Sequence, residues 1–374
     1  MSAAVAHRFD PDQLQDIKTR ERLSSLLARF GVKVRGGWCL CPFHSEKTPS
    51  CKVDDRRGTL HCFGCGQHGD AIDVIQALKG GDFVAAVEFL GGARELSLED
   101  RETARRQRIE EEAAEKERAQ RDTSKAAEIF AAGKPIKGTH AALYLRGRGL
   151  TVSPRMWGDL RFAPALPYWG YRDARSDDIV ELGAYPAMLA AIRDPVTNDL
   201  IGVHRTYLSD KEPIKLIPPG DRKRNGVKKI TGTMWGGAIF LSPPAPRLII
   251  GEGIETALSA DELDVGGGKV AVAAAVNLTN LSGKATASGP HPQYPDEPQR
   301  RIPNGEPDHE RPGFMPPDWA AEIIILGDGD SEPVMTQATL ATAVNRLMEL
   351  DRAVSVAMAP PGKDWNDVLR EGDR

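Results

Sequence analysis

Cys41-Pro-Phe-His44 and Cys62-Phe-Gly-Cys65 are the two short runs that decide the fold of the N-terminal part of this chain, and seventeen residues separate them. Each run places two metal-ligating side chains close enough to share one tight turn. Two such turns brought together surround a point with three thiolates and one imidazole, the tetrahedral shell that Zn²⁺ prefers. The protein then fills all four positions, so we predict a structural zinc ion rather than a catalytic one.

The chain around these ligands is typical of a zinc ribbon. Residues 48–53 and 58–63 are two short strand-like runs joined by a polar turn. Cys39 and Cys51 are predicted to be spare thiols, although the spacing Cys39-x-Cys41 leaves open which sulfur binds first.

Residues 41–73 resemble the zinc-binding domain of bacterial DnaG-type primases, from Cys-Pro-Phe-His-Ser-Glu-Lys-Thr-Pro-Ser through the second ligand pair to Gly-Asp-Ala-Ile-Asp. They depart from the family at Cys51, because an aromatic residue usually follows Pro-Ser there. The resemblance implies that the ribbon contacts a single-stranded DNA template. It also implies that nearby cations contact the template phosphates: Lys47, Lys52, Arg56 and Arg57. A solvated charged face is the alternative for each of them.

Length and composition limit the remaining possibilities. The chain has 374 residues, of which 40% are hydrophobic and 27% charged, and this predicts two or three globular domains. No apolar stretch approaches the ~18–20 residues of a membrane span, and no signal peptide precedes the charged N-terminus. We therefore expect a cytoplasmic protein. The net charge of −4 means that any nucleic-acid binding has to come from local basic patches.

Periodicity and composition suggest the domain organisation. Apolar residues at helical spacing predict helices that pack on the ribbon, over residues 10–30, 70–78 and 82–90. Residues 101–121 hold seven basic and six acidic side chains, which is typical of a solvated helical linker. We expect four segments: a zinc-ribbon domain over 1–95, a charged helical linker over 96–133, a basic α+β subdomain over 134–245 and an α/β domain over 246–374.

The α/β domain begins after a proline-rich break. The run 247–253 predicts a short buried strand that ends in the glycine-flanked carboxylate Glu252, and a strand over 322–326 leads to Asp328 and Asp330. Further strands are predicted over 269–276 and 353–358. Strands that alternate with helices predict a parallel, doubly wound sheet, and the carboxylates that follow its strands should meet at one edge. Asp328 and Asp330 together can hold Mg²⁺, which prefers carboxylate, phosphate and water oxygens.

The order of strand, Glu, strand and Asp-x-Asp resembles the toprim domain shared by bacterial primases, topoisomerases and some nucleases. The run Pro-Gly-Lys-Asp-Trp-Asn-Asp-Val-Leu at residues 361–369 is similar to the end of that domain in phage and plasmid primases. The resemblance implies a catalytic site of five acidic residues: Glu252, Asp328, Asp330, Asp364 and Asp367. Glu252 would be the acid/base residue and would bind two Mg²⁺ or Mn²⁺ ions together with Asp328 and Asp330.

Two positions near Glu252 qualify this assignment. Glu255 is a further acidic candidate for the site, but primases often place that acid one residue later. This chain has Thr256 there.

The middle segment carries the strongest local basic patch. Residues 203–230 contain eight Lys or Arg side chains and three acidic ones, and such a stripe can neutralise phosphates. The pattern resembles the subdomain that precedes toprim in bacterial primases. The resemblance implies contacts with template or nucleotide from four residues: Arg205, Lys215, Lys228 and Lys229. An ordinary basic loop is the alternative for residues 222–224. The insert 283–318 has nine prolines and is predicted to be an extended, partly disordered loop.

These resemblances imply a DNA primase that makes short RNA primers on single-stranded DNA from ribonucleoside triphosphates. No Gly-x-x-x-x-Gly-Lys-Ser/Thr run is present, and the chain stops soon after the last acidic residue. We therefore expect a phage, plasmid or integrated-element primase whose helicase is a separate chain. A toprim nuclease and a non-catalytic single-stranded-DNA-binding replication accessory are the alternatives. A topoisomerase would need a further large domain with a nucleophilic tyrosine.

Overall fold

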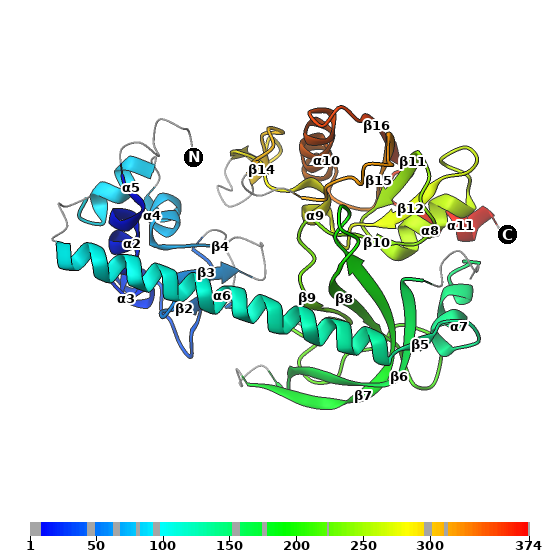
Figure 1. The fold of residues 1–374 in the computed structure, drawn as a ribbon, viewed down its shortest axis with the longest axis horizontal. Helices are drawn as coiled ribbons and strands as arrows, with labels where there is room; N and C mark the ends of the chain where they lie inside the picture. Colours follow the sequence, from blue (N-terminus) through cyan, green and yellow to red (C-terminus); the bar gives the residue numbers. More distant parts are fainter. Residues whose placement is uncertain are drawn as a thin grey trace. The chain divides into compact units, whose positions relative to one another are not determined.

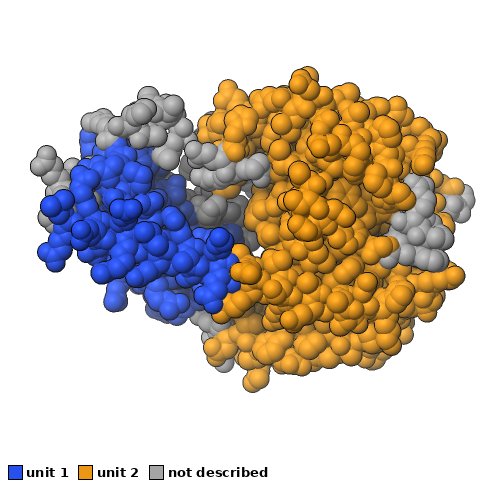
Figure 2. Space-filling view, viewed as in Figure 1, with its two compact units in different colours: residues 1–118, 290–301 blue, residues 119–289, 302–374 orange. Residues whose placement is uncertain are grey.

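The computed structural model describes residues 9–42, 49–62, 68–79, 83–92, 98–151, 158–173, 178–222, 224–294, 301–309 and 313–372. The chain forms two compact units (Figure 2): unit 1 comprises residues 1–118 and 290–301, and unit 2 comprises residues 119–289 and 302–374. Figure 1 gives the order of their helices and strands. Within the described ranges, none of the helices combines the length and apolar character that crossing a bilayer requires.

Unit 1 contains a small antiparallel sheet of four strands in sequential order. They are β1 (Trp38–Cys39), β2 (Cys51–Asp54), β3 (Thr59–Cys62) and β4 (His68–Gly69). The register pairs Cys39 with Cys51 and Cys51 with Cys62. Successive side chains of a strand point to opposite faces. The thiols of Cys39, Cys51 and Cys62 therefore line the buried face.

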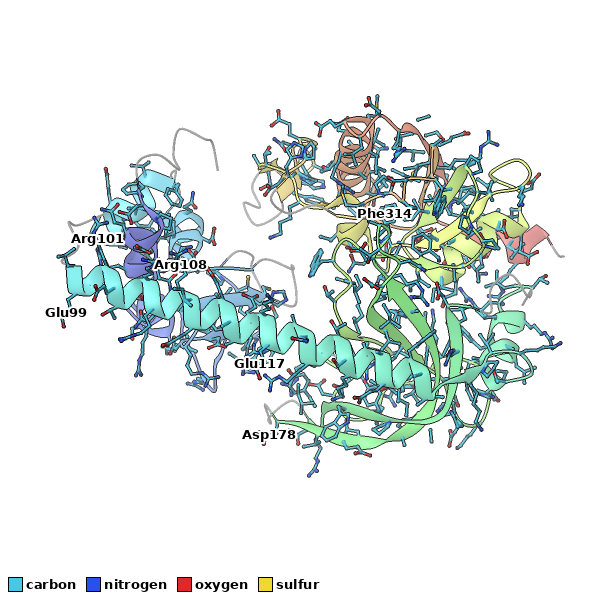
Figure 3. The ribbon with its side chains drawn as sticks, viewed as in Figure 1. Glu99, Arg101, Arg108, Glu117, Asp178 and Phe314 are labelled. Carbon is cyan, nitrogen blue, oxygen red and sulfur yellow. The ribbon has the colours of Figure 1, made fainter. Side chains whose placement is uncertain are left out.

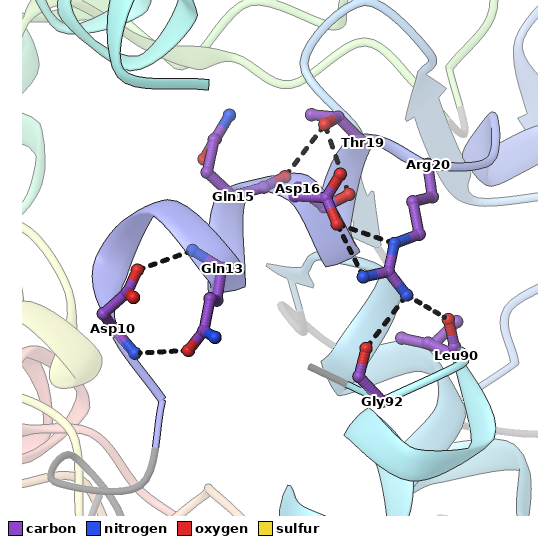
Figure 4. Close-up of polar contacts among 8 residues, drawn as sticks. All are labelled: Asp10, Gln13, Gln15, Asp16, Thr19, Arg20, Leu90 and Gly92. Atoms are coloured by element: carbon purple, nitrogen blue, oxygen red, sulfur yellow. Dashed lines mark hydrogen bonds and ion pairs between the residues drawn. The ribbon is translucent and has the colours of Figure 1, made fainter. Parts of the chain in front are cut away.

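Four helices cover this sheet and complete its core: α2 (Pro11–Thr19), α3 (Leu23–Arg29), α4 (Ala71–Lys79) and α5 (Phe83–Phe89). Their buried apolar residues, such as Ile17, Leu27 and Ile72, form one cluster with the buried residues of the strands. Helix α2 starts with a capping box, in which Asp10 and Gln13 each accept a hydrogen bond from the backbone N–H of the other, as Figure 4 shows.

Arg20 ties α2 to the end of α5. Its guanidinium group contacts the Asp16 carboxylate at 2.6 Å and donates hydrogen bonds to the carbonyl oxygens of Leu90 and Gly92 (Figure 4). A small domain with a limited core gains order from such cross-links.

The charged segment forms one long helix, α6 (Leu98–Ala132). Its first half is attached to α2 by ion pairs of Arg101 with Asp10 and of Arg108 with Asp12, both 3.3 Å long. Figure 3 labels the two arginines on α6. Near its other end, Ala126 and Phe130 are buried in the core of unit 2.

The first part of unit 2 is an antiparallel sheet of five strands in sequential order. They are β5 (Lys134–Pro135), β6 (Leu160–Tyr171), β7 (Ile179–Arg193), β8 (Leu200–Tyr207) and β9 (Lys228–Gly232). One face packs with the end of α6, around Tyr168 and Tyr207. The other face packs with α7 (His140–Gly147) and with the second sheet of the unit.

The second sheet has the strand order β10-β12-β11-β15-β16. Strands β11 (Arg247–Gly251), β12 (Ala271–Ala274), β15 (Glu322–Gly327) and β16 (Ala353–Met358) are parallel. The sheet expected to be parallel is in fact mixed, because β10 (Ile239–Phe240) adds an antiparallel edge.

Helices cover both faces of this sheet, as a doubly wound fold requires. Ile249 of β11 and its neighbours on the same face pack with α8 (Ile254–Glu262) and α11 (Trp365–Gly372). Leu248 and Ile250 point the other way and pack with α9 (Leu278–Ser282) and α10 (Pro333–Met348). The continuously apolar sequence of β11 follows from burial on both faces.

One hydrophobic core crosses the domain boundary that we predict at residue 245. It joins α7 and the β6–β7 face to α8, α11 and the second sheet, and the backbones of Arg193 and Ala238 form a β-bridge between the two parts. The two parts therefore pack as one compact body.

Part of the described insert forms regular structure. Strands β13 (Ser288–Pro290) and β14 (Arg301–Pro303) pair with each other. Phe314, which is labelled in Figure 3, is fully buried. The buried guanidinium group of Arg346 in α10 donates hydrogen bonds to the carbonyl oxygens of Ser282, Leu281 and Phe314. These bonds attach the chain at both ends of the insert to α10, and the extended, partly disordered character predicted for the insert stays a prediction.

Candidate metal centre and acidic site

Three thiols meet in unit 1 at the predicted zinc position. The Sγ atoms of Cys41, Cys51 and Cys62 lie within 4.8 Å of one another, and all three residues are buried. Sulfur atoms around a tetrahedral Zn²⁺ with ~2.3 Å bonds lie about 3.8 Å apart, so this donor set fits zinc. The predicted ligands His44 and Cys65 lie outside the described residues. Cys41 and Cys62 are therefore the two members of the predicted quartet that the structure places together.

Cys51 is the thiol that the spacing argument set aside. The structure brings it into the cluster because it lies directly across the sheet from Cys62. The alternation of buried and exposed residues along β2 is the signal that could have indicated this, since it places Cys51 and Val53 on the buried face. Cys39, the other thiol predicted to be spare, is also buried. It lies on the neighbouring strand β1, where it pairs with Cys51.

The opposite face of the ribbon carries aromatic and basic side chains. Trp38, Lys52 and His61 occupy one cross-strand row, in which the Lys52 ammonium lies 5.0 Å from the centre of the Trp38 ring. Lys52 and His61 are exposed. Arg56 and Arg57 are exposed in the turn between β2 and β3, whereas Lys47 lies outside the described residues.

In unit 2, acidic residues gather at the carboxyl edge of the second sheet. Glu252 follows β11, Asp328 and Asp330 follow β15, and Asp364 precedes α11. Burial, together with the charges of Asp364, Glu252 and Asp330, raises the pKa of Asp328 to about 6. Four carboxylates that influence one another in this way repel when all are ionised, and a bound cation relieves such repulsion.

The carboxylate of Asp328 is arranged to accept a further partner. Its Oδ2 atom accepts a hydrogen bond from the Thr256 hydroxyl at 3.4 Å, whereas its buried Oδ1 atom has no hydrogen-bond partner among the described residues. Gly329 allows the tight turn beside it, because a Cβ atom there would collide with the Pro360 carbonyl oxygen. Buried polar atoms are normally paired. An unpaired carboxylate oxygen in an acidic cluster fits a divalent cation such as Mg²⁺.

Glu252 and Asp367 have different environments. Glu252 is an exposed residue, yet desolvation of its carboxylate raises its pKa against the opposing charge of Lys228, and Asp330 raises it as well. Asp367 lies in the first turn of α11, where its backbone N–H donates to Asp364 Oδ1 at 2.7 Å and its own carboxylate lies 3.5 Å from the Asp364 backbone nitrogen. These contacts make Asp367 part of a helix cap, and both of them are with Asp364.

The four basic residues of the middle segment that are predicted to contact template or nucleotide lie on two different faces of the first sheet. Lys228 lies opposite Thr206, and Lys229 lies opposite Arg205, so the two lysines point to opposite sides. Lys228 faces the second sheet together with Lys215.

On the other side, Arg205 donates hydrogen bonds to the Tyr207 hydroxyl and the Ile230 carbonyl oxygen, and Lys229 lies 4.5 Å from the centre of the Tyr168 ring. The structure therefore brings Lys215 and Lys228 to the acidic site and leaves Arg205 and Lys229 away from it.

Sequence reasoning missed two polar residues beside the acidic edge. Tyr144 of α7 donates a 2.5 Å hydrogen bond to Glu255, and His204 of β8 is buried near Lys228. Burial, then the charge of Lys228, lowers the pKa of His204 to about 4, which keeps the imidazole neutral at pH 7. No motif marks either residue, and only the packing of the two sheets brings them near the edge.

Comparison with known proteins agrees with the zinc cluster. The family described as CHC2 zinc finger, the DnaG zinc ribbon, matches residues 10–106, and a domain of unknown function (DUF7146) matches residues 120–241. The chain is similar to the DNA primase of Lactococcus lactis, with 37% identity over 100 residues, which are 25% of this chain and 16% of the relative. It is also similar to the DNA primase of Staphylococcus aureus, with 28% identity over 162 residues, 42% of this chain and 27% of the relative.

A solved primase structure also aligns with this chain. The crystal structure of the zinc-binding and RNA polymerase domains of the Aquifex aeolicus primase aligns with 97% of this chain and 83% of that chain, at 16% identity and a TM-score of 0.36. The chain spans between 14% and 27% of the length of the curated relatives it matches.

The thiol cluster and the family match together identify the segment 10–106 as a zinc ribbon of the CHC2 type. Through this ribbon and its sequence relatives, the chain is similar to the DnaG-type primases.

Proposed function

We propose that this protein is a DNA primase that synthesises short RNA primers on single-stranded DNA by Mg²⁺-dependent nucleotidyl transfer. The proposed setting is the replication of a phage, plasmid or integrated element. One observation carries the proposal: Glu252, Asp328, Asp330 and Asp364 share the carboxyl edge of a parallel sheet, and Asp328 there has a raised pKa and an unpaired oxygen. The relatives named above are DNA primases, which supports the same activity.

In this proposal, residues 246–374 are a toprim domain and residues 134–245 are the first subdomain of the catalytic core. The parallel order of β12, β11, β15 and β16, with acidic residues after β11 and β15, supports the toprim assignment. Residues 1–95 bind template and residues 96–133 tether them to the core. The domain boundaries are part of the proposal.

Asp328 and Asp330 would hold Mg²⁺ or Mn²⁺ together with Glu252. Bound metal would supply stabilisation of the attacking and leaving oxygens at the α-phosphate. Glu252 would orient the 3′-hydroxyl and accept its proton, and the raised pKa of this carboxyl supports such a role. Lys215 and Lys228, whose side chains are 37% and 42% exposed beside this edge, would bind phosphate oxygens of the triphosphate.

The ribbon would bind the template through its outer face. Trp38 offers a ring for base stacking, and Lys52 and His61 in the same row offer polar and cationic contacts. Zinc on the inner face would hold the strands in register without taking part in phosphoryl transfer.

The test is one incubation of the full chain with single-stranded DNA, Mg²⁺ and labelled ribonucleoside triphosphates. We expect short new oligomers from the wild type and none from Asp328→Ala or Asp330→Ala. Glu322→Gln is the matched control, because Glu322 begins the same strand β15 at its far end and pairs with Arg247 at 2.7 Å. Cleaved template in place of oligomers would indicate a nuclease, and neither product would indicate a binding protein. Undiminished synthesis by both alanine variants would overturn the metal assignment.

A further inference from the structure

Glu255 has a role that the acidic site does not explain. It lies in the first turn of α8, three residues after Glu252, but it is buried, with 6% of its surface exposed. Three groups from other elements meet its carboxylate: the hydroxyl of Tyr144 and the ammonium groups of Lys215 and Lys228.

The geometry joins these groups through the two carboxylate oxygens of Glu255. Oε1 accepts the 2.5 Å hydrogen bond from Tyr144 and lies 2.9 Å from the Nζ atom of Lys215, while Oε2 lies 3.9 Å from the Nζ atom of Lys228. Only 8% of the Glu255 side chain is exposed, compared with 37% and 42% for the two lysines. The carboxylate is thus the fixed centre, and the lysines extend from it toward solvent.

The surroundings of Glu255 and Tyr144 decide which of the two side chains carries a charge. Burial opposes ionisation of Glu255, but Lys228, Lys215 and the Tyr144 hydrogen bond outweigh it, and the pKa of Glu255 falls below its usual value. Burial raises the pKa of Tyr144, and the charge of Glu255 raises it further, so the phenol stays neutral. One carboxylate contacts two ammonium groups, so Glu255 alone does not neutralise both lysines.

We propose that Glu255 is a positioning residue, which with Tyr144 holds the ammonium groups of Lys215 and Lys228 where they bind the phosphates of an incoming nucleoside triphosphate. The inference rests on the proposed function, because it takes the neighbouring carboxylates as the site of nucleotidyl transfer. Lys228 also acts on Glu252, so the lysine pair lies beside that site. This placement favours the triphosphate over a template phosphate as the ligand.

Glu255→Gln is the central variant, since it keeps the shape of the side chain and removes its charge. Without the carboxylate, two ammonium groups repel each other and lose their common anchor. The expected result is a KM for ribonucleoside triphosphate raised about tenfold with kcat changed less than about twofold, the pattern of lost substrate binding. Tyr144→Phe, which removes one hydrogen bond, should raise KM by about threefold. Glu322→Gln should match the wild type.

A direct binding measurement separates this inference from the proposed function. Calorimetric titration with inorganic pyrophosphate in Mg²⁺ should show about tenfold weaker binding by Glu255→Gln, and no further loss when that change is added to Lys215→Met/Lys228→Met. The affinity for single-stranded DNA should be unchanged. Equal or tighter pyrophosphate binding by Glu255→Gln would show that Glu255 only screens the lysines, and would overturn the inference.

Two other results have clear meanings. A loss of DNA affinity as large as the loss of pyrophosphate affinity would identify template phosphates as the ligand and also overturn the inference. Wild-type protein that makes no primers would refute the proposed function, whereas an active Glu255→Gln enzyme with unchanged KM would refute the inference alone. If Glu255→Gln unfolds, as thermal denaturation would show, Tyr144→Phe provides the same test on a smaller scale.

Discussion

Asp328→Asn should stabilise unit 2 in the absence of Mg²⁺, although it removes an expected metal ligand. Burial and the charges of Asp364, Glu252 and Asp330 raise the pKa of Asp328 from its ordinary value of 3.8 to about 6. A carboxyl with a raised folded-state pKa holds its proton more tightly in the folded protein than in the unfolded chain. The contribution of Asp328 to the free energy of unfolding is therefore highest below about pH 4 and falls as the pH rises to about 6 and beyond.

The magnitude follows from the size of this pKa difference. A difference of roughly 2 in pKa corresponds to about 3 kcal/mol in the free energy of unfolding. Asp328 is only partly buried, so screening by solvent reduces the expected cost to about 1–2 kcal/mol. Asparagine carries no charge and avoids this cost. Above pH 7, Asp328→Asn should raise the midpoint of thermal unfolding by about 2–8 °C, and about half of the gain in free energy should remain at pH 5.

Differential scanning calorimetry of the full chain can measure this effect, in Mg²⁺-free buffer that leaves the zinc in place. Asp318→Asn is the control, because that side chain is fully exposed in the same unit and its ion pair with Arg352 is 3.8 Å long. Added Mg²⁺ should stabilise the wild type at pH 8 and leave Asp328→Asn unchanged. An Asp328→Asn protein that is less stable than the wild type at pH 8, or a difference independent of pH, would refute the electrostatic reasoning.

Three further predictions concern other parts of the chain. Arg346→Met should lower the free energy of unfolding by about 2–4 kcal/mol in urea, because it leaves three buried carbonyl oxygens unpaired; a loss below about 1 kcal/mol would contradict the anchoring role. Cys62→Ser should reduce the zinc content measured by mass spectrometry, whereas Cys39→Ser should retain one ion, and equal zinc in both proteins would contradict the assignment. Trp38→Ala should weaken binding of single-stranded DNA by about 1–3 kcal/mol in fluorescence anisotropy, with the exposed Lys33→Ala as control, and unchanged affinity would exclude a stacking role.

The strands and helices of the second sheet were largely predictable from sequence. The strand predicted over 353–358 has those same bounds in the structure, and the strand predicted over 322–326 is one residue longer. The strand predicted in the run 247–253 begins at Arg247 and ends at Gly251, just before Glu252. Continuous apolar runs bounded by Gly, Pro and acidic residues identify strands that are buried on both faces. The antiparallel strand β10 was not found, because two residues carry no periodicity.

The zinc cluster was predictable in part for a similar reason. Ligand spacing is a local property, and it identified Cys41 and Cys62. The position of Cys51 depends on which residues of β2 and β3 pair with each other, and register is decided by the turn and the buried face rather than by spacing between ligands.

The basic stripe shows what composition alone leaves undetermined. Eight cations within residues 203–230 suggest one surface, but a strand directs adjacent residues to opposite faces, so Lys228 and Lys229 separate. Carboxylates that follow parallel strands converge whatever the details of packing, because the strands end at a common edge. Lysines from a loop and an antiparallel strand reach that edge only if another sheet packs there, and the core that joins the two sheets brings them to it. The acidic half of the site is therefore a property of one domain, whereas its cationic half depends on the packing of two. A change at that packing interface, such as Tyr144→Phe, should therefore weaken triphosphate binding before it disturbs the arrangement of the carboxylates.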